Sequence, residues 1–356
     1  MKRATLFLVP ILLTACQEAP SNSADATPAK TVDTRDAGTP LGFEDAGPVP
    51  ATLAVSEAFR VQVVLDRLGF SPGVIDGQSG PSLALALRGF QEANDLSPTG
   101  TLDDPTRKAL TRWRDVAPMR AVRIPPAFAA GPFFPNLPKD AAAQAKLPAI
   151  GYRDLTEALA ERFHTTPAVL AQLNRNGPIT AQASLIVPNI ADIDPATLGE
   201  DARGWNATLQ KLAVSPKQPQ AAKVVVDKSE GTLRAYDEGG KLIAQFPATM
   251  GSAHDPLPIG TWKIQGVSRN PDFRYNPKLF WDVSDSKASA LLKPGPNNPV
   301  GVAWLDLSKP HYGIHGTGEP QTIGRAESHG CVRLTNWDVA RLAQMVKVST
   351  PAIFQN

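Results

Sequence analysis

Two residues near the C-terminus have the types and spacing needed for nucleophilic catalysis. Cys331 lies within the stretch SHGCVRL, and His315 lies sixteen residues earlier within IHGT. The stretch GTGEPQTIGRAES between them contains three glycines and a proline, so it can fold back as a loop. A cysteine nucleophile needs a neighbouring base or cation to form its thiolate. We therefore interpret Cys331 as a nucleophile and His315 as its general base, and we expect the histidine to lower the pKa of the thiol modestly.

The residues around Cys331 suggest how a substrate would be held. The run CVRLT is typical of a β-strand, and its two-residue period places Arg333 on the same face as the thiol. A guanidinium there could hold a substrate carboxylate. Gly330 permits a close backbone approach, and the amides around Gly330 and Cys331 are candidate donors to an oxyanion.

Other chemistries fit the same residues less well. A zinc site could be drawn from the four side chains His311, His315, His329 and Cys331. His329 and Cys331 are separated by one residue, however, which leaves too little chain for both to ligate a tetrahedral ion from a strand, and no CxxC or HExxH pair is present. We therefore expect no metal and no cofactor. Trp304 and Trp337 fall in strand and helix patterns that are typical of core residues.

The N-terminus MKRATLFLVPILLTAC has two basic residues followed by a short apolar run, which is the pattern of a signal peptide over residues 1–15. Its last four residues resemble a bacterial lipobox, which implies that Cys16 is lipidated; an ordinary secretory signal with an incidental cysteine is the alternative. Gln17 replaces the aspartate that favours inner-membrane retention. We therefore expect a periplasmic protein anchored by lipid, in the outer membrane of a Gram-negative bacterium.

The charge of the exported chain gives no reason to expect nucleic acid as a partner. The full chain has 36 basic and 34 acidic residues, and removing Lys2 and Arg3 leaves 34 of each. With Cys16 lipidated, Cys331 has no intramolecular disulfide partner. In an oxidising compartment an unpaired thiol favours a chemical role over a packing role.

Composition and periodicity divide the chain into a multidomain α+β protein. Two helix-forming segments carry details used below: we expect His164 to be half-exposed between two helices, and Asn336 to be the N-cap of the helix NWDVARLAQMV. The expected segments are a disordered tether (16–53), a small three-helix domain (55–115), a proline-rich linker (116–148), a small module of two helices and a short strand (149–195), a second linker (196–220) and a mostly antiparallel β domain (221–356).

The C-terminal motif also carries a family resemblance. The stretch HGTGEPQTIGRAESHGCVRL resembles the signature of L,D-transpeptidase catalytic domains of the YkuD type, over about residues 221–355. This resemblance implies that Cys331 is the nucleophile, that His315 is the base, and that the backbone carbonyl of Gly316 orients it. It also implies that the substrate and oxyanion region is lined by Ser328, His329, Gly330 and Arg333. Many members of the family have asparagine where this chain has Arg333.

Two further segments resemble wall-binding modules. Residues 57–114 resemble the three-helix peptidoglycan-binding domain, through LGF at 68–70, IDG at 75–77 and FQ at 90–91. Residues 149–195 resemble a LysM module, without its usual opening turn, and this resemblance implies a βααβ fold. If these modules act as independent wall binders, removal of residues 55–200 should spare turnover of soluble substrates.

The resemblance implies a reaction on peptidoglycan. Cys331 would attack the carbonyl on the L-centre of diaminopimelate in a tetrapeptide stem and release D-Ala. The acceptor would be a stem amine, a lipoprotein lysine or water. An L,D-carboxypeptidase or cross-link hydrolase of the same fold stays open, as does a non-catalytic wall-anchoring protein. The expected partners are stem peptides, glycan, the membrane through Cys16, and an acceptor lipoprotein.

Overall fold

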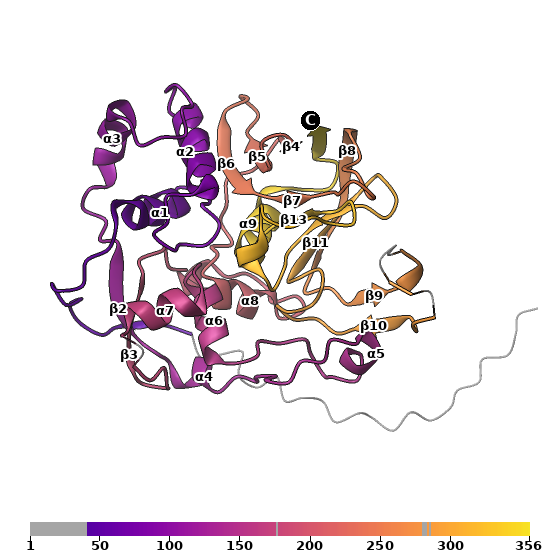
Figure 1. Ribbon diagram of the computed structural model, residues 1–356, viewed down its shortest axis with the longest axis horizontal. Helices are drawn as coiled ribbons and strands as arrows, with labels where there is room; N and C mark the ends of the chain where they lie inside the picture. The colour runs from indigo at the N-terminus through magenta and orange to yellow at the C-terminus, as the bar shows by residue number, and fades with distance from the viewer. Residues whose placement is uncertain (1–40, 176, 280–282, 285) are drawn as a thin grey trace, which may run out of the picture. The chain divides into compact units, whose positions relative to one another are not determined.

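The computed structural model describes residues 41–356 except 176, 280–282 and 285 (Figure 1). The signal peptide, Cys16 and most of the expected tether lie outside these residues. The helices are α1 (Glu57–Arg67), α2 (Pro81–Ala93), α3 (Asp104–Leu110), α4 (Pro126–Ala129), α5 (Ala141–Gln144), α6 (Leu155–Arg162), α7 (Pro167–Leu173), α8 (Trp205–Leu212) and α9 (Asn336–Met345). Short 3-10 turns are η1 (Thr111–Trp113), η2 (Pro195–Thr197), η3 (Pro277–Leu279) and η4 (Pro320–Thr322).

The strands form three sheets within the described part of the chain. The first has the order β1-β2-β3, the second pairs β9 with β10, and the third has the order β6-β5-β4-β14-β8-β11-β12-β13-β7. Their bounds are β1 (Glu44–Asp45), β2 (Met119–Arg123), β3 (Ser184–Pro188), β4 (Lys223–Asp227), β5 (Thr232–Tyr236), β6 (Leu242–Pro247), β7 (Thr249–Met250), β8 (Gly260–Arg269), β9 (Phe273–Tyr275), β10 (Ala290–Leu292), β11 (Ala303–Leu307), β12 (Gly313–His315), β13 (Val332–Arg333) and β14 (Pro351–Gln355).

The large sheet makes the C-terminal β domain mostly antiparallel, as its alternating sequence predicts. Only the pairs β4–β14 and β12–β13 of this sheet are parallel. Helix α9 packs on it and is buried on nearly all sides: Val339 and Leu342 are 0% exposed, and so is Trp337 on the opposite face of the helix. The segment is helical because the Thr335 side chain caps it by accepting a hydrogen bond from Asp338 N. Asn336 is therefore not the N-cap, and its amide is free for tertiary contacts.

The three-helix domain (α1–α3) lies against the edge of this sheet (Figure 1). The residues after α1 pair alongside the edge strand β6. Ser71 N donates to Gln245 O at 2.8 Å, and Gln245 N donates to Gly69 O at 3.0 Å. An exposed sheet edge is a hazard for edge-to-edge association, and here the domain covers it. The domain is thus part of the architecture of the β domain.

The expected linker at residues 116–148 is wrong, because residues 119–123 form β2, the middle strand of the first sheet. Together with α6, α7 and β3 it completes a βααβ domain. Val122 is 1% exposed and belongs to its core. The prolines of this segment flank the strand, and their number obscured an alternating run of five residues between them.

The expected tether also ends earlier than residue 53. Phe43 is 8% exposed and packs edge-on against Phe128 and Phe163, with ring centroids 5.1 and 5.2 Å away. Strand β1 follows it and pairs with β2. A single aromatic residue in a polar, proline-rich composition was enough to fix this segment, because its ring fills the core of the βααβ domain.

The second expected linker, residues 196–220, is likewise wrong. It contains α8, whose side chains Trp205, Leu209 and Leu212 are at most 5% exposed and lie in the core of the β domain. Their spacing of three and four residues is that of one helical face. The pattern was too short to be separated from the surrounding polar residues.

A buried polar cluster joins the three domains. His164, at the end of α6, bridges the Asp66 carboxylate of α1 (3.0 Å) and the Leu212 carbonyl of α8 (2.8 Å). Arg341 of α9 also contacts Asp66, at 2.9 Å. Burial by itself would raise the pKa of Asp66, but Arg341 and His164 hold it below its usual value. The expectation of a half-exposed His164 is therefore wrong, since the ring is 0% exposed and stacks on Trp337.

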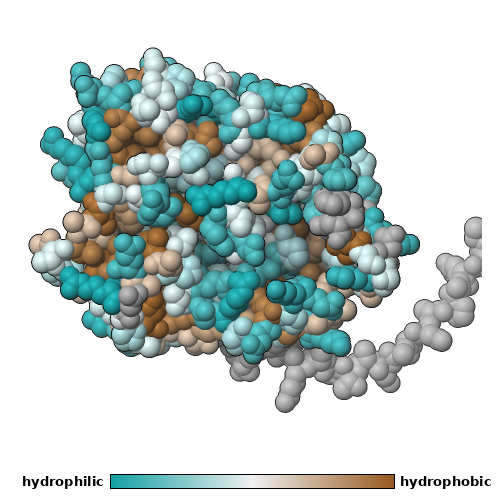
Figure 2. Space-filling view, viewed as in Figure 1, coloured by the Kyte–Doolittle hydropathy of each residue, from teal (hydrophilic) through white to brown (hydrophobic). Residues whose placement is uncertain are grey.

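The surface gives no sign of a membrane-spanning element in the described residues, since none of their helices is both long enough and apolar enough to cross a bilayer. Polar residues break up the apolar ones over the face shown in Figure 2. The most exposed large apolar side chains within the described chain are Ile259, Leu291 and Val348, which belong to separate elements. Isolated residues of this kind are normal on a folded surface.

Candidate active site

Strand pairing brings the two predicted catalytic residues together. β12 and β13 are parallel neighbours, with Ile314 opposite Val332 and His315 opposite Arg333. Opposed residues of paired strands point to the same face of a sheet, and residues two apart in a strand do so as well. Cys331 lies in the bend directly before β13, and the charge of Arg333 acts on both its thiol and the His315 imidazole, so the three side chains gather at this end of the strand pair. The loop 316–331 folds back between the two strands, as its glycines predict.

His315 is held as a neutral base. Its Nδ1 donates to the Gly316 carbonyl at 2.8 Å, so Nδ1 carries the proton and Nε2 carries the lone pair. The ring is 4% exposed and stacks on Trp304, with centroids 5.5 Å apart. Burial, with the positive charge of Arg333 as a second cause, lowers the pKa of His315 to about 4. At neutral pH the imidazole can therefore accept a proton.

The Cys331 thiol is protonated in this resting arrangement. It is half-buried, and its sulfur lies 3.9 Å from the His311 carbonyl oxygen. Burial raises its pKa and outweighs the lowering by a Gly313 backbone hydrogen bond and by Arg333. The expected lowering of the thiol pKa is therefore wrong. Thiol and imidazole are therefore both neutral at rest, and the thiol still holds the proton that an attacking sulfur must lose.

Hydrogen bonds fix the turn that precedes the thiol. Ser328 Oγ accepts from Gly251 N at 2.7 Å and donates to the Cys331 carbonyl at 2.6 Å. Gly330 has φ +91°, and a Cβ on it would lie 2.6 Å from the Tyr312 ring, so only glycine fits. These contacts hold the Gly330 and Cys331 amides in one geometry, which an oxyanion hole requires. The Ser328 side chain is 3% exposed, and the two hydrogen bonds described for its hydroxyl both hold the turn.

Arg333 supplies a positive charge beside the thiol and the imidazole. Its side chain is half-buried, and its Nε atom is buried without a hydrogen-bond partner in the described chain. Burial lowers the pKa of Arg333, whereas Cys331 and Glu319 raise it. An unsatisfied guanidinium of this kind is suited to a substrate carboxylate. His329 is half-buried in the turn before the thiol.

Two neighbours of the site were not predicted as functional. Trp304, expected in the core, is half-buried and forms one wall of the His315 site. Tyr312 packs against Gly330 beside the nucleophile. Trp304 stands on β11, and Tyr312 directly precedes β12, the strand next to β13. The only sequence signal was their place in strand-forming segments near His315.

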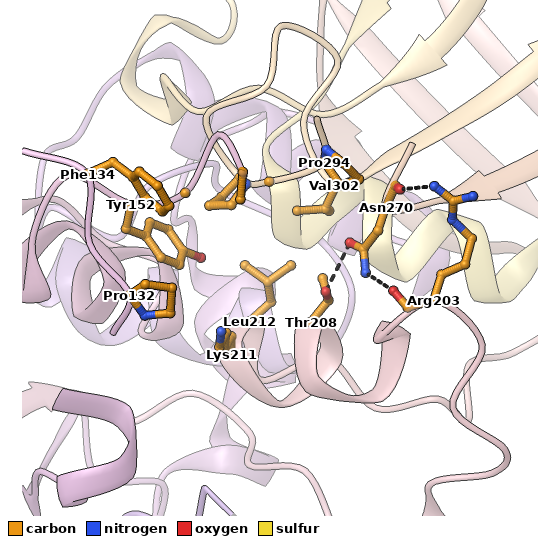
Figure 3. A pocket seen from close by; sticks show the side chains of 14 residues that line it. Pro132, Phe134, Tyr152, Arg203, Thr208, Lys211, Leu212, Asn270, Pro294 and Val302 are labelled. Atoms are coloured by element: carbon orange, nitrogen blue, oxygen red, sulfur yellow. Dashed lines mark hydrogen bonds between the residues drawn. The ribbon is translucent and has the colours of Figure 1, made fainter. Parts of the chain in front are cut away.

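A separate cavity of about 360 Å³ contains neither catalytic residue (Figure 3). It lies between α8, the residues before α6 and the loop around Pro294. Phe134 and Tyr152 form one wall, and Asn270 of the opposite wall bonds to Thr208 and Arg203. Tyr152 is significant because its hydroxyl also donates to Glu161 of α6, at 2.8 Å.

Two segments of the chain match known domain families. Residues 221–353 match the L,D-transpeptidase catalytic domain, YkuD, and residues 56–110 match a putative peptidoglycan binding domain. A solved L,D-transpeptidase from Mycobacterium smegmatis is similar over 37% of this chain and 58% of that chain, with 20% identity and a TM-score of 0.31.

Two Bacillus proteins are similar over more of their length. The putative L,D-transpeptidase YkuD of Bacillus subtilis is 28% identical over 199 residues, which are 55% of this chain and 91% of that protein. Its counterpart in Bacillus licheniformis is 30% identical over 197 residues, which are 54% of this chain and 89% of that protein. Identity of 30% over nearly all of a relative, together with the match of residues 221–353 to the catalytic domain, shows that the chain belongs to the YkuD family of L,D-transpeptidases.

Proposed function

We propose that this L,D-transpeptidase cleaves the diaminopimelate–D-Ala bond of peptidoglycan tetrapeptide stems and transfers the acyl group to an amine. The amine of a neighbouring stem gives a 3-3 cross-link, and a lipoprotein lysine gives an attached protein. The observation that carries this proposal is the pairing of His315 with Arg333 directly after Cys331, where the guanidinium charge acts on both thiol and imidazole and Gly316 fixes the Nδ1 proton of a neutral ring.

The proposed steps use these groups in order. Cys331 Sγ attacks the stem carbonyl carbon while His315 Nε2 takes the thiol proton, and the Gly330 and Cys331 amides donate to the developing oxyanion. Collapse of the intermediate breaks the amide bond, and Nε2 returns the proton to the departing D-Ala amine. A thioester is left on Cys331. The acceptor amine attacks it, loses a proton to His315, and the released thiolate recovers that proton.

The remaining parts of the proposal concern location and binding. We place the enzyme in the periplasm, anchored in the outer membrane by lipid on Cys16. The three-helix domain belongs to a family of putative peptidoglycan binding domains, so it is the part that would hold the sacculus. The βααβ domain, which resembles a LysM module in sequence, would contact glycan. These assignments rest on sequence resemblance.

Mass spectrometry of muropeptides after incubation with the purified mature protein tests the reaction. A 3-3 cross-linked product with release of D-Ala supports transpeptidation, whereas tripeptides alone indicate a carboxypeptidase. Cys331→Ser should abolish every product while the protein stays folded, and His315→Gln should slow turnover by about a hundredfold. An unchanged product yield from Cys331→Ser refutes the nucleophile assignment.

A further inference from the structure

Asn336, the first residue of α9, makes contacts that reach toward the catalytic histidine. It is 0% exposed. Its Nδ2 donates to Glu161 Oε1 at 2.8 Å and to the Pro296 carbonyl at 3.0 Å. Its Oδ1 accepts from Val302 N at 3.2 Å. The side-chain amide is thereby fixed in orientation at both ends.

The same amide is wedged against the backbone that orients His315. A Cβ on Gly316 would lie 2.3 Å from Asn336 Oδ1, and a Cβ on Gly301 would lie 2.2 Å from it. Only glycines permit this approach. The Gly316 carbonyl is the acceptor for Nδ1 of His315, so the Asn336 amide packs against the residue that orients the ring, alongside the bonds from Gly316 N to the Val300 and Ala303 carbonyls.

Glu161 anchors this arrangement from another domain. It lies on α6 of the βααβ domain, is 3% exposed, and accepts from Tyr152 OH through its second oxygen. No described cation pairs with it. Burial, with Glu157 as a lesser cause, raises its pKa to about 8, so it is mostly uncharged at neutral pH. Burying a carboxyl without a cationic partner lowers the stability of the folded state. An apolar side chain of similar size would avoid this cost, but it could not accept the hydrogen bond that orients Asn336.

We infer that Glu161 is a positioning residue for the L,D-transpeptidase reaction, acting through Asn336 and the Gly316 peptide on the His315 imidazole. The inference rests on the proposed function of the Cys331 site. It assigns to the βααβ domain a part in catalysis that is separate from any binding of the wall. Displacement of the Gly316 carbonyl would release Nδ1 and turn Nε2 away from the thiol.

The test measures acylation of Cys331 by imipenem, followed by intact mass on the full mature chain at several imipenem concentrations. Glu161→Ala should lower the maximal rate about tenfold or more while the half-saturating concentration stays within about twofold, because the substrate contacts are intact. Glu161→Gln keeps an acceptor for Asn336 and should stay within about twofold of the parent. The double variant with Asn336→Ser should be no slower than Asn336→Ser alone, since both act on one route.

The matched control is Ser71→Ala. Ser71 Oγ donates to Asp338 Oδ2 at 2.7 Å, so this change also removes a buried bond between α9 and another domain, but not one that reaches Gly316. It should lower the melting temperature and leave the acylation rate unchanged. The pH profile provides a second readout: in Glu161→Ala a loosened, more hydrated His315 should move the acid limb of the rate upward from about pH 4.

Three outcomes overturn the inference: a parental rate in Glu161→Ala, an equal loss of rate in Ser71→Ala, or additive losses in the double variant. If Glu161→Ala does not fold, Asn336→Ser decides, and a parental rate and pH profile in that variant overturn the inference. Failure of the proposed function looks different, because the parent protein itself would then neither acylate with imipenem nor release D-Ala.

Discussion

Replacing Glu161 by glutamine should change how the free energy of unfolding depends on pH. In the folded protein the carboxyl is buried, accepts hydrogen bonds from Tyr152 and Asn336, and has a pKa raised from 4.5 to about 8. Because the folded pKa is the higher one, the folded state binds the proton more tightly. Its contribution to stability is complete below pH 4.5 and is lost as pH rises toward 8.

The size of the effect follows from the two pKa values. Each pH unit between them removes up to 1.36 kcal/mol, so a change from pH 5 to 7.5 removes on the order of 3 kcal/mol. Glutamine keeps an oxygen for Asn336 and a polar group for Tyr152, but it does not titrate. The stability of Glu161→Gln relative to the parent should therefore rise by about that amount over this interval.

Guanidinium unfolding at pH 5 and at pH 7.5 measures this difference for both proteins, with intrinsic fluorescence and circular dichroism as coincident probes. Comparison at each pH cancels the titration of all other groups. Glu57→Gln, the same chemical change at a side chain that is 58% exposed, is the matched control. An identical difference for Glu161→Gln at the two pH values, or one of opposite sign, refutes the reasoning.

Three further results are expected. The rate of Cys331 acylation should hold down to about pH 4, because His315 stays neutral there; an acid limb centred near 6.5 would contradict the burial of this ring. Gly313→Ala should slow acylation and cost about 1–3 kcal/mol of stability, since its Cβ would lie 2.4 Å from the indole that stacks on the imidazole, whereas Gly266→Ala, with open space around it, should do neither. Removal of residues 55–200 should prevent stable folding of the remainder, because it uncovers Trp337 and its charged neighbours; a folded, active fragment by circular dichroism and D-Ala release would show that the domains are independent.

The last of these predictions reverses what the sequence suggested. Asp66, His164 and Arg341 are ionisable residues, and in a sequence such residues are typical of solvated surfaces. In the structure they meet in one buried cluster, because each supplies the charge or hydrogen bond that the others need. Charge pairing and hydrogen bonding of this kind link residues up to 275 positions apart. The periodicity of a single segment cannot predict such contacts.

The elements that were missed share a different cause. Strand β2 and helix α8 are short, and prolines or polar residues surround them, so their own sequences barely favour a regular structure. Each becomes ordered by contributing to a core built mostly by other segments. The same holds for Phe43, whose burial depends on two phenylalanines more than eighty residues away.

The sequence by itself was sufficient to predict the chemistry of this protein, from a cysteine, a histidine and an arginine placed around a glycine-rich loop and a short strand. Those constraints act over a few residues, so they can be recognised without the fold. Only the tertiary structure decided the protonation states, because burial by distant strands lowers the pKa of His315 and raises that of Cys331. It also decided that Glu161 is linked to the active site. The contacts from the Glu161 carboxyl through Asn336 to Gly316 and His315 join three separate segments of the chain.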